Sequence, residues 1–459
     1  MTSMTSTFVK ERKEGDISSV FASLSGEEAV VLPKEFSDLK HTIAQNKDAL
    51  RESWLRLKAS LRKEIDEIKT RGSEVIPSVD FDELSDLSSE KRQEILKRGS
   101  VVIRNVISRD DALQLKQDAK DYIKANPSTK AFPADKPVVY ELYWSQTQVK
   151  ARSDPRMQKA MGFINTLWHV DPSFPVSLRH NVTYADRLRI RNPGDAKFAL
   201  GPHADGGSLE RWEDPEYRAC YKSIWDGDWE HYDAYDATHR IEANMDLHTG
   251  AGACGVFRSF QGWLSMSDVG PGEGSLLVAP LVQQVTAYYL LRPFFNDKDE
   301  FDLDSTTFQG AAPGRGQEFS QDLHPELDLT HLMTSIPLVH PGDAVFWHCD
   351  LIHAVDPLHQ GQSDSSVLYI PAAPLCRLNV EYLVRQRDAF LKGIPGPDFP
   401  GYPHAAGESK HVGRATQEFL EQVGGEGGLQ AMGLAPLHVQ DGTAGEQKAI
   451  EIANHLLGF

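Results

Sequence analysis

Four histidines in this chain are each followed, two positions later, by an aspartate. In an extended segment, residues i and i+2 point to the same face, so an imidazole and a carboxylate at this spacing can reach one metal ion. A mononuclear iron(II) site of the facial type uses two imidazoles and one carboxylate and leaves its other coordination positions open. The pattern therefore raises the hypothesis of a non-haem metal centre. The four pairs are His169/Asp171, His203/Asp205, His231/Asp233 and His348/Asp350.

Local sequence favours the pair His203 and Asp205 over the others. It follows a strand–turn–strand pattern over residues 187–200, whose turn reads Asn-Pro-Gly. Two glycines, Gly206 and Gly207, come next and would let a substrate approach the ion closely. The pairs that begin at positions 169 and 231 lie instead in turn-like or loop-like sequence.

A second imidazole has to come from a later strand. Residues 341–354 begin with Pro-Gly, which is typical of a type II turn, and continue with a short apolar strand at 344–347. His348 and His353 both lie just past the end of that strand. From the residues alone, either histidine can be the third ligand.

The order of these motifs resembles the Fe(II)/2-oxoglutarate-dependent oxygenase superfamily, including its phytanoyl-CoA-hydroxylase-like members. In that pattern the last histidine of the Pro-Gly-Asp segment is the ligand, which matches His353. A closer resemblance is to the YbiU-like family, a branch of that superfamily. It rests on six short stretches in order: YWS at 143–145, HADGGSLERW at 203–212, IEANMDL at 241–247, FRSFQGWL at 257–264, LRPFF at 291–295 and YIPAAP at 369–374.

The resemblance implies that His203, Asp205 and His353 bind Fe(II) and that 2-oxoglutarate and O2 are cosubstrates. It further implies oxidation of a C–H bond of a small molecule, such as an amino acid or a secondary metabolite, with succinate and CO2 as co-products. The outcome would be hydroxylation, oxidative cyclisation or desaturation. Two alternatives stay open: a cupin-like metal-dependent isomerase or dioxygenase that uses no 2-oxoglutarate, and a catalytically inactive ligand-binding protein.

The far carboxylate of 2-oxoglutarate needs a cation, and arginine binds it with paired hydrogen bonds. Many members of the superfamily carry that cation some ten residues after the last histidine ligand, but residues 360–367 contain no Arg or Lys. Arg258 ranks first as a substitute, because a guanidinium in an otherwise apolar and small-residue strand needs a partner. The further candidates, in order, are Arg189 and Arg191 on one face of a strand and then Arg377, with hydroxyl contacts from Ser366 and Tyr369.

The substrate pocket is expected beside the metal. Because 2-oxoglutarate is an anion, this pocket has to gather arginines, and a uniformly acidic pocket would contradict the assignment. The residues expected to line it are Gly206, Gly207, Trp212, Phe346 and Trp347.

The pattern of apolar and turn-forming residues along the chain predicts the elements that position these residues. Between residues 135 and 375, short apolar runs alternate with Pro, Gly, Asn and Asp. This predicts a mainly β fold of antiparallel strands, a jelly roll or double-stranded β-helix of the cupin-like kind. Helical patterns flank that region. An apolar stripe with spacings of four and three predicts a long amphipathic helix over residues 41–71. Shorter helices are expected at 89–98, 108–123, 380–391 and 414–423.

These patterns divide the chain into three parts. Residues 1–98 form an N-terminal helical extension, 99–378 the jelly-roll oxygenase domain, and 379–459 a C-terminal helical extension packed on the core. The first 38 residues are polar and are expected to be loosely ordered.

Composition narrows the class of protein further. The 459 residues include 48 Lys+Arg and 66 Asp+Glu, a net charge of −18, which repels phosphate backbones and argues against a nucleic-acid partner. The charged N-terminal residues are not followed by an apolar segment, so no signal peptide is expected. Gln and Arg interrupt the most apolar stretch, 276–295, so we expect no membrane span. Four cysteines without a C-x-x-C pair indicate free thiols in a reducing, cytoplasmic setting.

Overall fold

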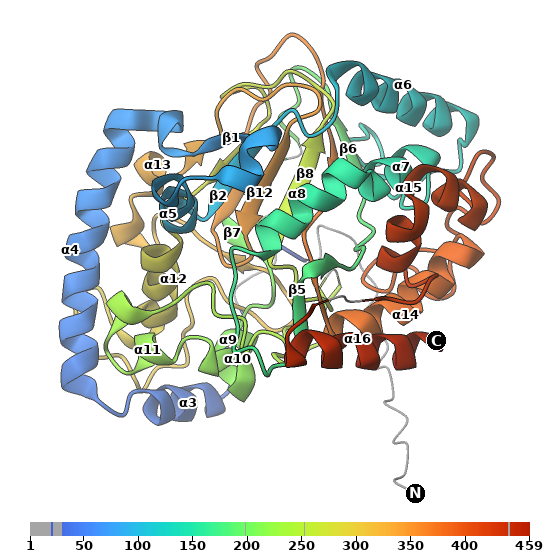
Figure 1. Ribbon diagram of the computed structural model, residues 1–459. Helices are drawn as coiled ribbons and strands as arrows, with labels where there is room; N and C mark the ends of the chain where they lie inside the picture. Colours follow the sequence, from blue (N-terminus) through green and yellow to red (C-terminus); the bar gives the residue numbers. More distant parts are fainter. Residues whose placement is uncertain (1–19, 22–29, 198, 252, 439–440) are drawn as a thin grey trace, which may run out of the picture.

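A computed structural model describes residues 20–21, 30–197, 199–251, 253–438 and 441–459 of the chain (Figure 1). Most of the polar N-terminal stretch that was expected to be loosely ordered lies outside the described residues. Helices account for more of the described residues than strands do. The protein therefore has a mixed α and β structure, and the expectation of a mainly β fold was wrong in this respect.

The strands are short and most of them lie in the middle of the chain. They are β1 (Ser78–Asp80), β2 (Ser100–Arg104), β3 (Ala131–Phe132), β4 (Val139–Tyr140), β5 (Val176–Asn181), β6 (Leu188–Arg191), β7 (His203–Ala204), β8 (Phe260–Ser265), β9 (Leu276–Val278), β10 (Gln317–Glu318), β11 (Thr334–Ser335), β12 (Ala344–His348), β13 (His353–Val355), β14 (Ser365–Tyr369) and β15 (Pro374–Cys376).

The helices lie before, between and after these strands. The longer ones are α3 (Glu35–Ile43), α4 (Lys47–Arg71), α5 (Ser89–Arg98), α6 (Arg109–Ala125), α7 (Gln146–Ser153), α8 (Pro155–Asn165), α12 (Val282–Leu291), α14 (Arg377–Lys392), α15 (Gln417–Ala431) and α16 (Ala444–Leu457). The short α-helices are α9 (Glu210–Glu213), α10 (Pro215–Ala219), α11 (Lys222–Trp225) and α13 (Leu329–Leu332). The 3-10 turns are η1 (Gly72–Val75), η2 (Phe81–Asp86), η3 (Trp229–His231), η4 (Arg292–Phe294) and η5 (Pro325–Leu327).

Two sheets form the centre of the molecule. The larger has the strand order β1-β2-β12-β8-β14-β6-β4-β3, and the smaller has the order β10-β7-β13-β9-β11. Every pairing in them is antiparallel except that of β1 with β2. The prediction of antiparallel pairing is confirmed. Strands β6 to β9 alternate between the two sheets along the chain, and β12 to β14 do so again.

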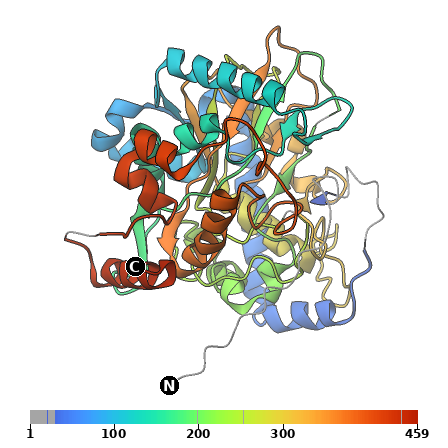
Figure 2. The ribbon, with the colours of Figure 1, turned by 90° about the vertical axis from the view of Figure 1, so that its right-hand side faces the viewer.

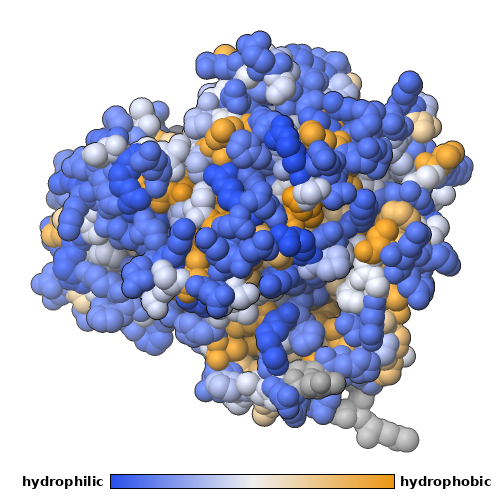
Figure 3. Space-filling view, turned by 45° about the horizontal axis from the view of Figure 1, so that its top comes forward, coloured by the Kyte–Doolittle hydropathy of each residue, from blue (hydrophilic) through white to orange (hydrophobic). Residues whose placement is uncertain are grey.

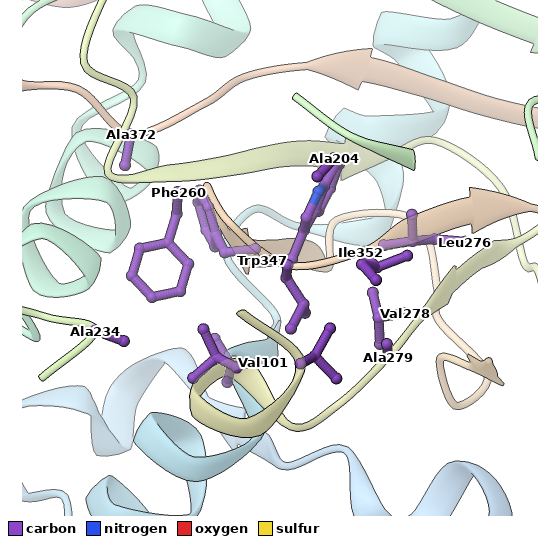
Figure 4. Close-up of a cluster of buried hydrophobic side chains, with 14 of the residues drawn as sticks. Val101, Ala204, Ala234, Phe260, Leu276, Val278, Ala279, Trp347, Ile352 and Ala372 are labelled. Carbon is purple, nitrogen blue, oxygen red and sulfur yellow. The ribbon is translucent and has the colours of Figure 1, made fainter. Parts of the chain in front are cut away.

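Side chains from both sheets meet in one hydrophobic core. Figure 4 shows Val101 from the larger sheet between Phe260 of the same sheet and Val278 of the smaller one, and all three belong to one core cluster. All three are fully buried. Burial of apolar area stabilises a fold by roughly 25 cal/mol per Å2, so this shared core holds the two sheets together.

The sequence predicted the N-terminal helices in part: the helix expected over residues 41–71 begins at Lys47, and α3 before it was not expected. The apolar stripe of the expected helix lies within α4, and its members Leu50, Trp54, Leu57, Leu61, Ile65 and Ile68 are all buried. Helix α5 ends at Gly99, which adopts the left-handed conformation that favours glycine. The Ser108 side chain accepts a hydrogen bond from the Asp111 amide at the start of α6.

Helix α12 escaped prediction because its sequence lacks an amphipathic stripe. Nine of the ten residues of α12 are buried, so apolar side chains surround this helix and no 3.6-residue period stands out. It packs against α4 at the left of Figure 1. No helix within the described ranges is both long enough and apolar enough to cross a bilayer.

The C-terminal helices pack against the opposite side of the sheets from α4. Helix α15 contacts α7, and α16 contacts α14 and β5 (Figure 2). Helix α16 was not expected, although its start carries a capping box formed by Thr443 and Glu446. The face shown in Figure 3 is mostly hydrophilic, and its apolar residues are scattered in small groups.

Helix α4 offers a matched pair of leucines for testing how far it stabilises the fold. Leu57 is fully buried, whereas Leu55 is 47% exposed. We expect Leu57→Ala to lower the free energy of unfolding by about 2–5 kcal/mol, because it leaves a cavity. Leu55→Ala should change it by less than about 0.5 kcal/mol. Urea denaturation measures both, and equal effects would mean that the stripe does not pack as described.

Candidate metal centre

Strand pairing brings the two predicted histidine ligands face to face. In the smaller sheet β7 pairs with β13, and His203 lies directly opposite His353. The centroids of the two imidazole rings are 4.1 Å apart. Asp205 follows β7, and its two carboxylate oxygens lie 3.9 Å from the His203 Nε2 and 3.8 Å from the His353 Nε2. One ligand atom from each of the three residues falls within 4.8 Å of the others.

Each imidazole is held in the tautomer that a metal ion requires. The Nδ1 of His203 lies 2.7 Å from the Gly201 carbonyl oxygen, and the Nδ1 of His353 lies 3.0 Å from that of Leu351. A carbonyl oxygen only accepts hydrogen bonds, so each Nδ1 carries the proton. Each Nε2 therefore presents its lone pair to the space beside Asp205, as metal-ligating histidines do.

The electrostatics of the three groups also suit a cation. Burial, reinforced by the neighbouring His203, lowers the pKa of His353 to about 3, so its imidazole is neutral. Burial acts to raise the pKa of Asp205, but His203, His353 and Arg258 outweigh it and lower that pKa to about 2. A neutral imidazole and an ionised carboxylate are the protonation states in which these groups bind metals.

The triad opens into a cavity of about 170 Å3. Its wall carries both charge signs, so the acidic pocket that would contradict an anionic cosubstrate is not found among the described residues. The arginines that line it are Arg187, Arg189, Arg258 and Arg315, and the acids are Asp186, Asp205, Glu210 and Asp398. The other expected site residues on this wall are Gly206, Gly207, Trp347 and Tyr369.

Arg189 lies on β6, deep in the cavity wall, and is only 4% exposed. Its Nη2 donates to the Gly274 carbonyl and to the Ser365 hydroxyl, each at 3.2 Å. Its Nε is buried without an acceptor in the described part of the chain. An unsatisfied buried donor is costly, so this guanidinium is suited to an anionic ligand.

Arg258 lies beside the triad itself. Its Nη2 is 3.8 Å from an oxygen of Asp205, and its guanidinium carbon is 5.3 Å from the centroid of the Tyr184 ring. Its side chain is 11% exposed. Two cationic groups thus reach the same cavity, Arg189 from strand β6 and Arg258 from the segment just before β8.

Five of the expected site residues point elsewhere. Arg191 is fully buried but ion-paired with Asp195, whereas Arg377 is exposed and paired with Glu381. Neighbouring residues on a strand face opposite sides. Trp347 and Tyr369 lie on the cavity wall, so Phe346 and Ser366, which have the opposite parity on their strands, face away from it. Trp212 lies on helix α9, and all three side chains are buried in other contacts. Ser366 Oγ donates to Asp364, Trp212 Nε1 donates to the Leu290 carbonyl, and Phe346 packs toward Gly262.

Some cavity residues were missed by the sequence reasoning. Arg187 and Gln261 could have been found, because each continues the inward alternation of a strand that was already identified. Phe399 and Phe21 could not, since they reach the cavity from distant parts of the chain. The Phe21 ring lies edge-on to His203, with centroids 4.7 Å apart.

The other His-x-Asp pairs do not form a comparable site in the described residues. His169 pairs with Asp233 on the surface, and His231 pairs with Asp228. His348 is fully buried, stacks on Trp168 and lies 2.8 Å, through its Nε2, from the Ala234 carbonyl oxygen.

His348, Cys349 and Asp350 form a second group with metal-ligand spacing. The carboxylate of Asp350 is already committed, since it forms a buried ion pair with Arg240 and accepts hydrogen bonds from the hydroxyls of Tyr221 and Tyr232. This group therefore belongs to the structural core.

The chain belongs to the Gig2-like family, whose model matches residues 30–434. The protein YbiU of Escherichia coli (strain K12) is 36% identical to it over 352 residues, which cover 73% of this chain and 82% of YbiU. The sequence-based resemblance to YbiU-like proteins is thereby confirmed.

Solved structures agree with this relationship. The crystal structure of GlcNAc Inducible Gene 2 from Candida albicans superposes with a TM-score of 0.85 at 34% identity, covering 94% of this chain and 96% of that one. A structure from Salmonella typhimurium LT2 has a TM-score of 0.77 at 33% identity, covering 88% of this chain and 98% of that one.

The buried Arg240–Asp350 ion pair predicts a strong asymmetry between single and double substitutions. Arg240→Met leaves a buried carboxylate without its cation and should lower the free energy of unfolding by about 3–5 kcal/mol. Adding Asp350→Asn removes that charge and should restore part of the loss. Denaturation of both variants checks this, and a double variant less stable than Arg240→Met would contradict it.

The same ion pair determines in which direction the stability of the fold changes with pH. Burial favours the protonated acid, yet Arg240 outweighs it and lowers the pKa of Asp350 to about 2. The stabilisation is therefore fully present above the unfolded pKa of about 3.9 and is lost as the pH falls toward 2. This part of the acid dependence should be absent in the double variant.

Proposed function

We propose that this protein is a non-haem Fe(II)/2-oxoglutarate-dependent oxygenase, an oxidoreductase that oxidises a C–H bond of a small molecule and releases succinate and CO2. The observation that carries this proposal is the triad of His203, Asp205 and His353. Two imidazoles and one carboxylate converge at the wall of a cavity, the imidazoles from adjacent strands of one sheet and the carboxylate from the residue after β7. Two nitrogens and one carboxylate with open positions suit iron(II).

The order of the strands supports a double-stranded β-helix core. Strands β6 to β9 and β11 to β14 are distributed over two sheets and pair antiparallel within them, as in a jelly roll. On this view residues 99–378 form the oxygenase domain, and the helical segments 1–98 and 379–459 extend it on either side.

Arg189 is the residue we propose for the far carboxylate of 2-oxoglutarate. It lines the cavity and has a buried donor to spare, and its Nη2 reaches the hydroxyl of Ser365. Ser365 belongs to residues 360–367, where many superfamily members carry the cation. The guanidinium of Arg189, from the neighbouring strand β6, would thus replace the cation that residues 360–367 lack, with Ser365 beside it.

When bound, iron would supply the activation of O2 and the oxidation of the substrate. The protein itself has to hold the iron, orient its ligands and exclude water from the cavity. The carbonyls of Gly201 and Leu351 orient the two imidazoles. Leu200, Leu276 and Val355 make the adjoining cavity wall apolar, which strengthens electrostatic contacts within it.

The proposal predicts a spectroscopic signature that needs no substrate. Purified protein with Fe(II) and 2-oxoglutarate, kept free of oxygen, should show a visible charge-transfer band. His203→Ala and His353→Ala should both lose the band, because each removes an iron ligand. His348→Gln is the matched control, since its amide can still donate to the Ala234 carbonyl, and it should retain the band.

A wild-type protein without the band would overturn the assignment, and so would an unchanged band in His203→Ala and His353→Ala. Release of succinate when oxygen is admitted would exclude the cupin-like alternative that uses no 2-oxoglutarate. Release above the level of the alanine variants would also exclude an inactive ligand-binding protein.

Arg189 can be tested separately from the iron. Arg189→Met should weaken 2-oxoglutarate binding by about ten- to a hundredfold, the effect of losing a charge-assisted hydrogen bond. The affinity for Fe(II) alone should stay unchanged. Titration of the charge-transfer band with 2-oxoglutarate measures the first quantity, and equal affinities in variant and wild type would exclude Arg189 from the cosubstrate site.

A further inference from the structure

We propose that Arg258 binds a carboxylate of the substrate, so that the substrate is a small organic acid with a largely apolar body. That this acid is then oxidised rests on the proposed function, whereas its binding does not. Since Arg189 suffices for the far carboxylate of 2-oxoglutarate, Arg258 is a second cation in the same cavity with a separate task.

The contacts of Arg258 leave its guanidinium available for a ligand. The 3.8 Å approach to Asp205 is too long for a hydrogen bond, and the contact with Tyr184 is with the face of the ring. A side chain that is 89% buried and makes no hydrogen bond from its guanidinium within the described residues lacks the acceptors that five N–H donors need. A carboxylate can accept two of them at once.

The position of Arg258 suits a substrate better than a cosubstrate tail. Arg189 lies on β6 and donates a hydrogen bond to Ser365 on β14. Arg258 lies just before β8 and reaches an iron ligand, Asp205. A molecule bound to Arg258 therefore lies within a few ångströms of the metal position, where a C–H bond to be oxidised has to be.

Arg187 is less suited to this task. Its Nε is engaged with the carboxylate of Asp186 at 3.1 Å, and its guanidinium carbon lies 5.2 Å from the centroid of Phe399. Arg258 has no such carboxylate at hydrogen-bond distance. The structure thus favours it as the recognising group.

The walls around Arg258 restrict the rest of the ligand. Tyr184, Cys254 and Phe399 line the cavity on this side and offer mainly apolar surface. The acids Asp186, Glu210 and Asp398 also line the cavity, and an acidic lining disfavours a phosphate dianion more than a monoanion. A ligand with a single carboxylate on an otherwise apolar molecule fits both the apolar surface and the acidic lining.

Benzoate and benzamide are the probes that test this inference, because they share shape and differ in charge. They would be titrated by calorimetry into the full-length protein loaded with Fe(II) and 2-oxoglutarate without oxygen. Benzoate should bind at least about tenfold more tightly than benzamide, as expected for a charge-assisted pair. Arg258→Met should abolish this preference, and Arg258→Lys should retain part of it.

Arg62→Met is the matched control, since Arg62 lies on the exposed side of α4 and its loss changes the net charge equally. It should leave the preference unchanged. Equal affinity of the two probes for the wild type would overturn the inference, and so would a preference that survives in Arg258→Met. If Arg258→Met and Arg258→Lys both lose the charge-transfer band, Arg258 positions Asp205 and does not bind the substrate.

The same titrations in metal-free protein separate this inference from the proposed function. Should the wild type show no charge-transfer band, the oxygenase assignment fails, but a benzoate preference that depends on Arg258 still supports the binding site. Arg189→Met should keep that preference. If Arg189→Met removes it and Arg258→Met does not, benzoate occupies the cosubstrate site and the inference is wrong.

Discussion

The pairing of two very short strands, β7 and β13, is the constraint on which the rest of the site depends. It places His203 opposite His353 and so sets the distance between two imidazoles that are 150 positions apart in the chain. The backbone carbonyls of Gly201 and Leu351 then turn both rings so that each Nε2 faces Asp205. A one-residue slip in this register would turn one ring to the other side of the sheet.

Such short strands cannot hold their register alone, and the surrounding layers supply the support. The inner faces of both sheets share one core, which fixes β7 and β13 against the larger sheet (Figure 4). Helices α4 and α12 extend that core on one side, and α14 to α16 cover the other (Figure 1). The buried pair Arg240 and Asp350, capped by tyrosine hydroxyls, ties the loop before β13 to the segment after η3.

The candidate arginines for the cosubstrate show how the fold resolves a choice that sequence spacing leaves open. Arg189 and Arg191 share a strand face, yet Asp195 binds Arg191 and leaves Arg189 on the cavity wall. Arg258 was ranked first for the cosubstrate because a buried guanidinium needs a partner. It lies beside Asp205, and we propose it for a second ligand, whereas Arg189 reaches the hydroxyl of Ser365.

Local signals in the sequence by themselves determined the capped helices α5 and α6, the stripe of α4, most central strands and the His203–Asp205 pair. These depend on periodicity, on caps and on i, i+2 geometry, all of which act over a few residues. The tertiary structure placed His353, and not His348, beside His203 and Asp205, and it brought Phe399 to the same cavity as Arg258. It also decided that residues 282–291 form a buried helix. Those outcomes depend on strand register and on burial by distant segments, and neither leaves a local pattern in the chain.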